Sequence, residues 1–328
     1  MTISPAPSPA FASGRAAAHL WFFVNGAVFG TWAVRIPAFK AEFGLSEGTL
    51  GLVLLAMAFG AVTAFFWGGR WSDRIGASRA AALAAPVFIL LLPCLALAPS
   101  PVTLALVLFA FGAAGGGLDL SMNAYGAEVE ARRGRSSMSV MHALWSIGFG
   151  AASLAGWVAI RAGLDPMPHF LIVGAMMAAL AIAAYRLAVP SNGSQAEGGA
   201  PFHMPTGPVL AAAIFAGIAF LGEGALLDWT AIHAVLTLGE TADTGALLLA
   251  LFSIVMVALR LSGDRLILRM GARRALAGAT LLAITGPLVL GFAPGIAVAS
   301  LGLVITACGY ALMAPLAFSI AGRAPEPG

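Results

Sequence analysis

Ten long apolar stretches constrain the fold of this 328-residue chain more than any other feature. A helix needs about 20 mostly apolar residues to cross the hydrocarbon core of a bilayer. The stretches have that length, and helices are expected because backbone groups in lipid must bond internally and the period-2 alternation of a membrane barrel is missing. We therefore predict an all-α integral membrane protein, a bundle of about ten transmembrane helices. The predicted spans are roughly 17–38, 49–69, 79–98, 102–126, 138–160, 167–188, 207–235, 244–262, 274–292 and 295–320.

The composition excludes a water-soluble domain. Only 9% of the residues are charged and 60% are hydrophobic, whereas soluble domains carry about 25% charged residues. The net charge of +3 does not indicate a nucleic-acid partner, because the basic residues are explained by orientation in the membrane. Cys94 and Cys308 both lie in apolar stretches, so their spacing predicts neither a disulfide framework nor a metal site.

The basic residues between the stretches alternate between two sides of the membrane. Only Arg35, Lys40 and Arg161 fall on one side, and the remaining basic residues fall on the other. Lys and Arg accumulate in cytoplasmic loops, so this distribution predicts that both termini lie in the cytoplasm. An even number of spans agrees with this orientation.

A polar segment rich in Gly, Pro and Ser, residues 191–206, separates six stretches from four. We interpret it as a cytoplasmic linker between a six-helix half, 1–190, and a second half, 207–328. The motif Arg-Ile-Gly-Ala at 74–77 returns as Arg-Met-Gly-Ala at 269–272, and Trp32 and Trp229 are related by nearly the same offset. Parallel half-repeats of this kind are typical of one large transporter architecture.

The segment after the second stretch carries a glycine and charge motif. Gly69, Asp73, Arg74 and Gly76 have the spacing Gly-x-x-x-Asp-Arg-x-Gly, which resembles the signature between helices 2 and 3 of the major facilitator superfamily of transporters. The resemblance implies a cytoplasmic latch, a loop in which these residues and Arg79 contact neighbouring helix ends. A carboxylate favours a helix N-terminus and an arginine favours exposed carbonyls. Solvated loop charges are the alternative.

Within that superfamily, the sequences at 119–123, 134–148 and 222–229 resemble a bacterial branch near the fucose permeases. The resemblance covers nearly the whole chain. It implies two bundles that rock about a central site, in the inner membrane of a bacterium. Superfamily members usually have twelve helices, so we expect a bundle of six plus four that lacks the usual last two.

Asp119 and Glu223 are the candidates for proton coupling. Ionisable side chains at membrane depth are costly and mark functional sites. Asp119 shares a helix face with Asn123, and desolvation disfavours a charged carboxylate, which suits a group that takes up and releases a proton. The resemblance implies the same role, and a structural ion-pair partner is the alternative. Glu223, between Gly222 and Gly224, is the second candidate.

Other polar and aromatic residues are candidates for a substrate cavity. Asn25 can hold a hydroxyl group or bond a neighbouring helix, and His142 can titrate or pack. The tryptophans can stack on a ring or lie at the membrane interface. Asp228 can pair with Arg35 and close an outer gate, or remain a solvated charge. The candidate cavity residues are Asn25, Trp32, Asn123, His142, Trp145, Asp228 and Trp229.

These features predict a secondary transporter that moves a small-molecule solute by alternating access, coupled to protons. Neither a nucleophile–base pair nor a phosphate-binding loop occurs at a plausible spacing, so we expect no enzyme and no cofactor. The polar candidates favour a sugar-like solute, and a fifth stretch without a Gly-Pro motif favours symport. The alternatives are proton-driven efflux of amphipathic compounds and a truncated, non-transporting membrane protein. An oligomer is not implied.

Overall fold

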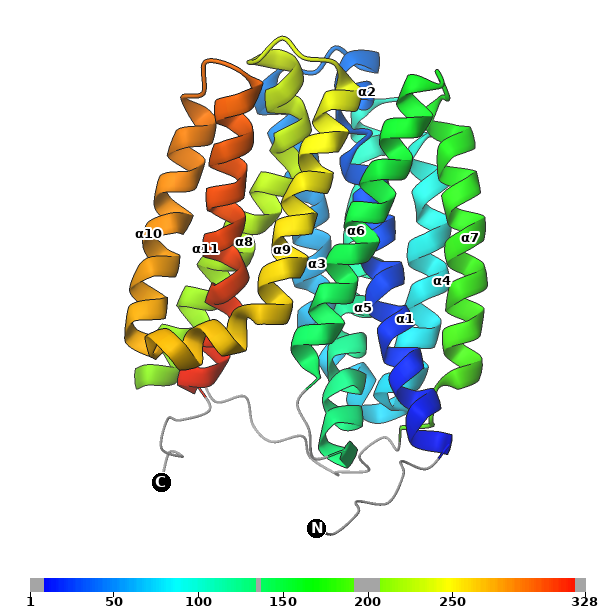
Figure 1. Ribbon diagram of the computed structural model, residues 1–328. Coiled ribbons are helices and arrows are strands. Elements are labelled where there is room, and N and C mark those ends of the chain that lie inside the picture. Colours follow the sequence, from blue (N-terminus) through cyan, green and yellow to red (C-terminus); the bar gives the residue numbers. More distant parts are fainter. Residues whose placement is uncertain (1–8, 134–136, 192–206, 322–328) are drawn as a thin grey trace.

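The computed structural model describes residues 9–133, 137–191 and 207–321, and the structural statements below refer to these residues. They form eleven α-helices and no β-strand (Figure 1). Ten helical segments are long and apolar enough to cross a membrane. The predicted fold class, an all-α membrane bundle, is therefore confirmed.

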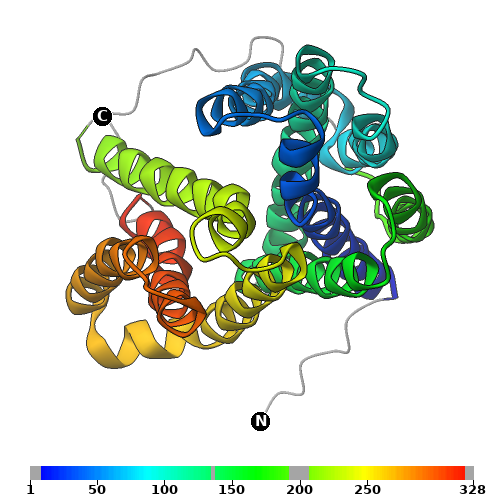
Figure 2. The same ribbon diagram turned by 90° about the horizontal axis from the view of Figure 1, so that it is seen from above.

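The long helices run side by side in two groups, which lie on opposite sides of the view in Figure 2. We call the end of the bundle where α1 begins and α11 ends the lower end, as drawn in Figure 1. The first group contains α1 (Pro9–Ala33), α2 (Ile36–Glu42), α3 (Glu47–Ile75), α4 (Ala77–Leu95), α5 (Pro101–Arg133), α6 (Met138–Arg161) and α7 (Pro166–Leu187). The second group contains α8 (Gly207–Leu236), α9 (Ala242–Met270), α10 (Ala272–Gly291) and α11 (Ile296–Ala321).

The prediction of two halves joined by a linker at 191–206 stays a prediction, because residues 192–206 lie outside the described residues.

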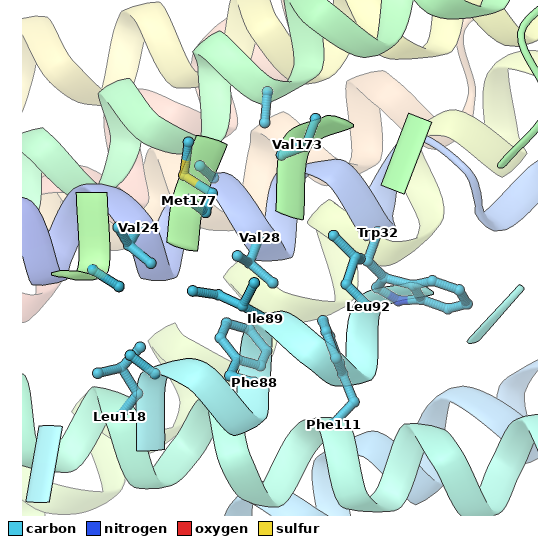
Figure 3. Close-up of a cluster of buried hydrophobic side chains, with 14 of the residues drawn as sticks. Val24, Val28, Trp32, Phe88, Ile89, Leu92, Phe111, Leu118, Val173 and Met177 are labelled. Carbon is cyan, nitrogen blue, oxygen red and sulfur yellow. The ribbon is translucent and has the colours of Figure 1, made fainter. Parts of the chain in front are cut away.

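The main apolar core lies around α1 in the first group. Val24 and Val28 of α1 pack beside Phe88 and Ile89 of α4 (Figure 3). Side chains of α5 and α7 complete this cluster, including Met177. Helices in lipid associate through close van der Waals packing rather than hydrophobic burial alone. This packing holds α1 in place within the first group.

The first predicted span, 17–38, is broken rather than continuous. α1 ends at Ala33 and the short α2 begins at Ile36, with Pro37 in its first turn. Proline has no N–H to donate and fits the first turn of a helix, where that N–H would have no partner within the helix. At the break, the main-chain N–H of Arg35 donates to the carbonyl of Trp32, three residues earlier, at 2.9 Å. The break places Arg35 at the upper end of the bundle.

Glycines let α3 and α5 approach each other closely. A Cβ atom at Gly112 would collide with the carbonyl oxygen of Met57, and one at Gly116 would lie 2.9 Å from the Cα atom of Ala61. Nothing lies within 4 Å of a Cβ atom added at Gly117. Gly112 and Gly116 are thus packing residues, as is common between membrane helices.

The expected loop after the second span is helical. α3 continues to Ile75, so Gly69, Asp73 and Arg74 lie in its last turns, and Arg79 lies in the first turn of α4. The side chains of Asp73, Arg74 and Arg79 are exposed. No described side chain forms an ion pair with them. The latch that the resemblance implies therefore stays a prediction.

The connection between α3 and α4 is a single residue, Gly76, with φ of +89°. Gly271, between α9 and α10, has φ of +80° and nearly the same ψ. Positive φ favours glycine, so the repeated Gly-Ala motif of the two halves encodes the same sharp helix turn. Beside it, Ser78 and Ser191 exchange hydrogen bonds of 3.0 and 3.2 Å between side chain and backbone.

Candidate functional site

A cavity of about 580 Å³ lies between the two helix groups. Its volume falls in the range of small-molecule sites, about 300–1,000 Å³. It extends from Trp32 and Asp228, toward the upper end, to Met138 at the start of α6. The polar lining residues are Asn25, Asp119, Asn123, His142, Glu223, Asp228 and Arg260, and the aromatic ones are Phe29, Trp32, Phe65, Trp145, Phe149 and Phe220. Both helix groups thus contribute to one site.

Arg260 on α9 links the two groups across the cavity. Its guanidinium donates to both carboxylate oxygens of Glu223 on α8, at 3.1 and 3.4 Å. The same guanidinium donates to the carbonyl of His142, at 3.2 Å, and to the hydroxyl of Ser146 on α6. It also lies 5.9 Å from the centre of the Trp145 ring, a cation–π distance. Glu223 therefore compensates the charge of Arg260.

Arg260 is a functional candidate that the sequence pattern alone does not single out. The charge distribution places it with the basic residues of the lower end, although it lies within the predicted span 244–262. An ionisable residue inside a span is a functional candidate by default. That rule, applied to Arg260 as it was to Glu223, would have identified it.

Asp119 on α5 faces the cavity beside Asn123. The Asn123 side-chain amide donates to the main-chain oxygen of Asp119 at 2.9 Å and to its Oδ1 atom at 3.4 Å. No basic side chain in the described part of the chain forms an ion pair with Asp119. The carboxyl group is left with one long hydrogen bond and open cavity beside it.

Asn25 joins three helices through its side-chain amide. It donates to the carbonyl of Gly115 on α5 at 3.2 Å, and it accepts a 2.7 Å hydrogen bond from the indole N–H of Trp145 on α6. Of the two roles left open by the sequence, this conformation shows the interhelical one. His142 likewise packs, with its ring edge-to-face on Phe22 at 5.2 Å.

The predicted gate between Arg35 and Asp228 is not formed. Arg35 is 5% exposed. Its Nε atom donates to Nδ1 of His169 at 3.1 Å, and its Nη2 atom donates to the carbonyl of Leu164 at 2.8 Å. The break between α1 and α2 therefore directs Arg35 toward the start of α7. Asp228 instead lines the cavity near its upper end.

The tryptophan candidates are divided between the cavity and its surroundings. Trp32 and Trp145 line the cavity. Trp229 does not, and its ring lies beside Gly51 on α3. Trp229 therefore faces α3. The assignment of Trp229 to the cavity is therefore corrected.

Ten membrane-spanning helices around a cavity that holds ionisable side chains are the architecture of a multi-pass membrane transporter. A sequence profile of the Major Facilitator Superfamily matches residues 19–328, and the chain belongs to this superfamily. Its members are transporters rather than enzymes.

Relatives and solved structures agree with this family. The chain is 32% identical over 302 residues to the uncharacterized transporter y4wD of Sinorhizobium fredii, covering 91% of this chain and 79% of the relative. Its fold is similar to a D-xylose-proton symporter, with a TM-score of 0.71 and 16% identity over 94% of this chain and 82% of that one. It is also similar to the transporter FucP in the outward conformation, with a TM-score of 0.61 and 17% identity over 95% and 84%. The resemblance to the major facilitator superfamily is therefore confirmed.

Proposed function

We propose that this protein is a secondary active transporter that moves a small solute across the cytoplasmic membrane by alternating access. The observation that carries the proposal is the cavity between the helix groups, because a site lined by both halves changes its access when the halves rock. Above the cavity, α2 packs against α8. Below, the lining reaches Met138 at the lower end. We infer that the cavity opens at the lower end, which the proposed orientation places in the cytoplasm.

Asp119 is the proposed proton carrier. It faces the cavity and has no basic partner among the described side chains, so its charge is uncompensated whenever it is ionised. Carrying such a charge between states at membrane depth is costly, and protonation removes that cost. Glu223 is the second candidate, but Arg260 already compensates its charge.

The proposed solute is polar and hydroxylated, and it moves inward together with a proton. The amide of Asn123 lines the cavity and can bond hydroxyl groups, whereas the amide of Asn25 is already bonded to Gly115 and Trp145. The similar structures include a symporter of D-xylose and protons, which supports this choice. The aromatic part of the lining favours a solute that also has an apolar ring face.

The test is an Asp119→Asn variant in liposomes, with Asp165→Asn as the matched control. Asp165 precedes α7 at the upper end and is exposed outside the cavity. A panel of radiolabelled pentoses, hexoses and amino sugars is first screened for uptake driven by a pH gradient. Asparagine imitates the protonated carboxyl, so Asp119→Asn should lose driven uptake at least about tenfold yet keep solute counterflow, which needs no net proton movement.

Two outcomes would contradict this proposal. Driven uptake of Asp119→Asn at the wild-type level would show that Asp119 does not carry the proton. Loss of both driven uptake and counterflow in a folded variant would assign Asp119 to solute binding instead. The Asp165→Asn control should retain both activities.

A further inference from the structure

The charges that line the cavity do not balance. Three carboxylates, from Asp119, Glu223 and Asp228, face one guanidinium, from Arg260. Glu223 takes that guanidinium at 3.1 Å, and under the proposed function Asp119 takes a proton. Asp228 then remains the acidic group for which the described chain supplies no counter-charge.

The position of Asp228 makes this imbalance relevant to the solute. Asp228 lies on α8 near the upper end of the cavity, together with the lining residues Trp32, Ala33 and Leu227. Above it, α2 packs against the end of α8. A solute that enters from the lower end therefore meets Asp228 at the closed end. Arg35, the basic residue that the sequence suggested as a partner of Asp228, is bound to His169 and Leu164.

One cationic group, the guanidinium of Arg260, is already bound in the cavity wall. The guanidinium of Arg260 lies over the Trp145 ring and against a carboxylate. Further aromatic rings line the cavity, among them Trp32, Phe29 and Phe149. The electron-rich faces of such rings attract cations, most strongly where water is excluded. A carboxylate without a partner among aromatic walls is the chemistry that recognises an organic ammonium group.

We propose that the solute is a small organic cation, a protonated amine on a compact ring, and that Asp228 binds its ammonium group. This inference rests on the proposed transport function and adds the charge of the solute. The ammonium donates to the Asp228 carboxylate, and the body of the solute contacts the aromatic walls and the Asn123 amide. Binding of the solute then supplies the missing counter-charge at the closed end.

The experiment measures binding of ligands that share a body and differ in charge. The first set is benzylamine, benzyl alcohol and benzoate, and the second is D-glucosamine, D-glucose and D-glucuronate. Dissociation constants are measured by titration calorimetry on the purified full chain in detergent, without a pH gradient. In at least one set the amine should bind about tenfold or more tightly than the neutral and acidic members, the factor expected from one charge-assisted hydrogen bond.

The variants assign this preference to a residue. In Asp228→Asn the amine should lose its advantage to within about threefold, while the matched Asp165→Asn variant should keep it. Equal or tighter binding of the neutral or acidic members to the wild type would overturn the inference, as would an absence of binding by both amines. A preference that persists in Asp228→Asn would overturn the role of Asp228. Because the binding experiment uses no pH gradient, its result can be interpreted even if proton-driven transport is not observed.

Discussion

Replacing Arg260 by glutamine should remove the main polar link between the two helix groups. Both members of the Arg260–Glu223 pair are largely buried, with side-chain exposures of 10% and 11%. The substitution leaves the Glu223 carboxylate without its counter-charge and removes the donors to His142 and Ser146. Both losses destabilise this conformation relative to the unfolded helices.

The magnitude follows from burial and from the number of bonds lost. Removing one partner of a buried ion pair costs about 3–5 kcal/mol. Here the pair lines a cavity that admits solvent, and interhelical hydrogen bonds in membranes average only about 0.6 kcal/mol. We therefore expect Arg260→Gln to cost about 3 kcal/mol and Glu223→Gln about 2 kcal/mol. The double variant should also cost about 3 kcal/mol, which gives a coupling energy of about 2 kcal/mol.

The assay is reversible unfolding in mixed micelles of increasing denaturing detergent, followed by tryptophan fluorescence and circular dichroism. The matched control is Arg161→Gln, because Arg161 is 63% exposed and lies 4.0 Å from Asp243. An exposed pair is worth less than about 1 kcal/mol, so this control should change stability little. A coupling energy below about 0.5 kcal/mol between Arg260 and Glu223 would refute the reasoning.

Two further predictions concern packing and orientation. Gly112→Ala should lower the free energy of unfolding by about 2–3 kcal/mol in the same assay, because the added Cβ atom collides with the Met57 carbonyl. Gly117→Ala should not lower it, since no atom lies within 4 Å of a Cβ atom added there. Equal effects of the two substitutions would contradict the packing of α3 on α5. The orientation is tested with single cysteines in a chain in which Cys94 and Cys308 are replaced. Ala162 and Ala131 are both exposed, at the upper and lower ends respectively. A cysteine at Ala162 should react with an impermeant thiol reagent in intact cells and one at Ala131 should not, and the reverse pattern would overturn the cytoplasmic placement of the lower end.

The sequence by itself determined the architecture, because the bilayer imposes a length and a composition on each spanning segment. Ten apolar stretches predicted ten spanning helices, and the described residues contain ten helical segments that are long and apolar enough to cross a membrane. The motif that repeats at Gly76 and Gly271 also has the same local structure at both places, because both glycines have positive φ. These features are local, so the length, composition and residue type of a segment suffice to predict them.

Part of the candidate site could also be predicted from the sequence. The cost of placing an ionisable group in lipid singles out Asp119, Glu223 and Asp228 without any knowledge of the fold. All three line the cavity. Which of them has a partner was not readable, because partners lie on helices distant in sequence.

Only the tertiary structure decided those pairings. Arg260 and Glu223 are separated by 37 residues, and Arg260 and Ser146 by 114. The side chain of Arg35 was free, by sequence, to reach Asp228, but the helix break at Pro37 turns it toward His169. An apolar bundle carries few charges, so the rotation of each helix about its axis decides which charges meet. That rotation is set by close packing, such as that of Gly112 on Met57, and packing is a property of the whole bundle rather than of any one stretch.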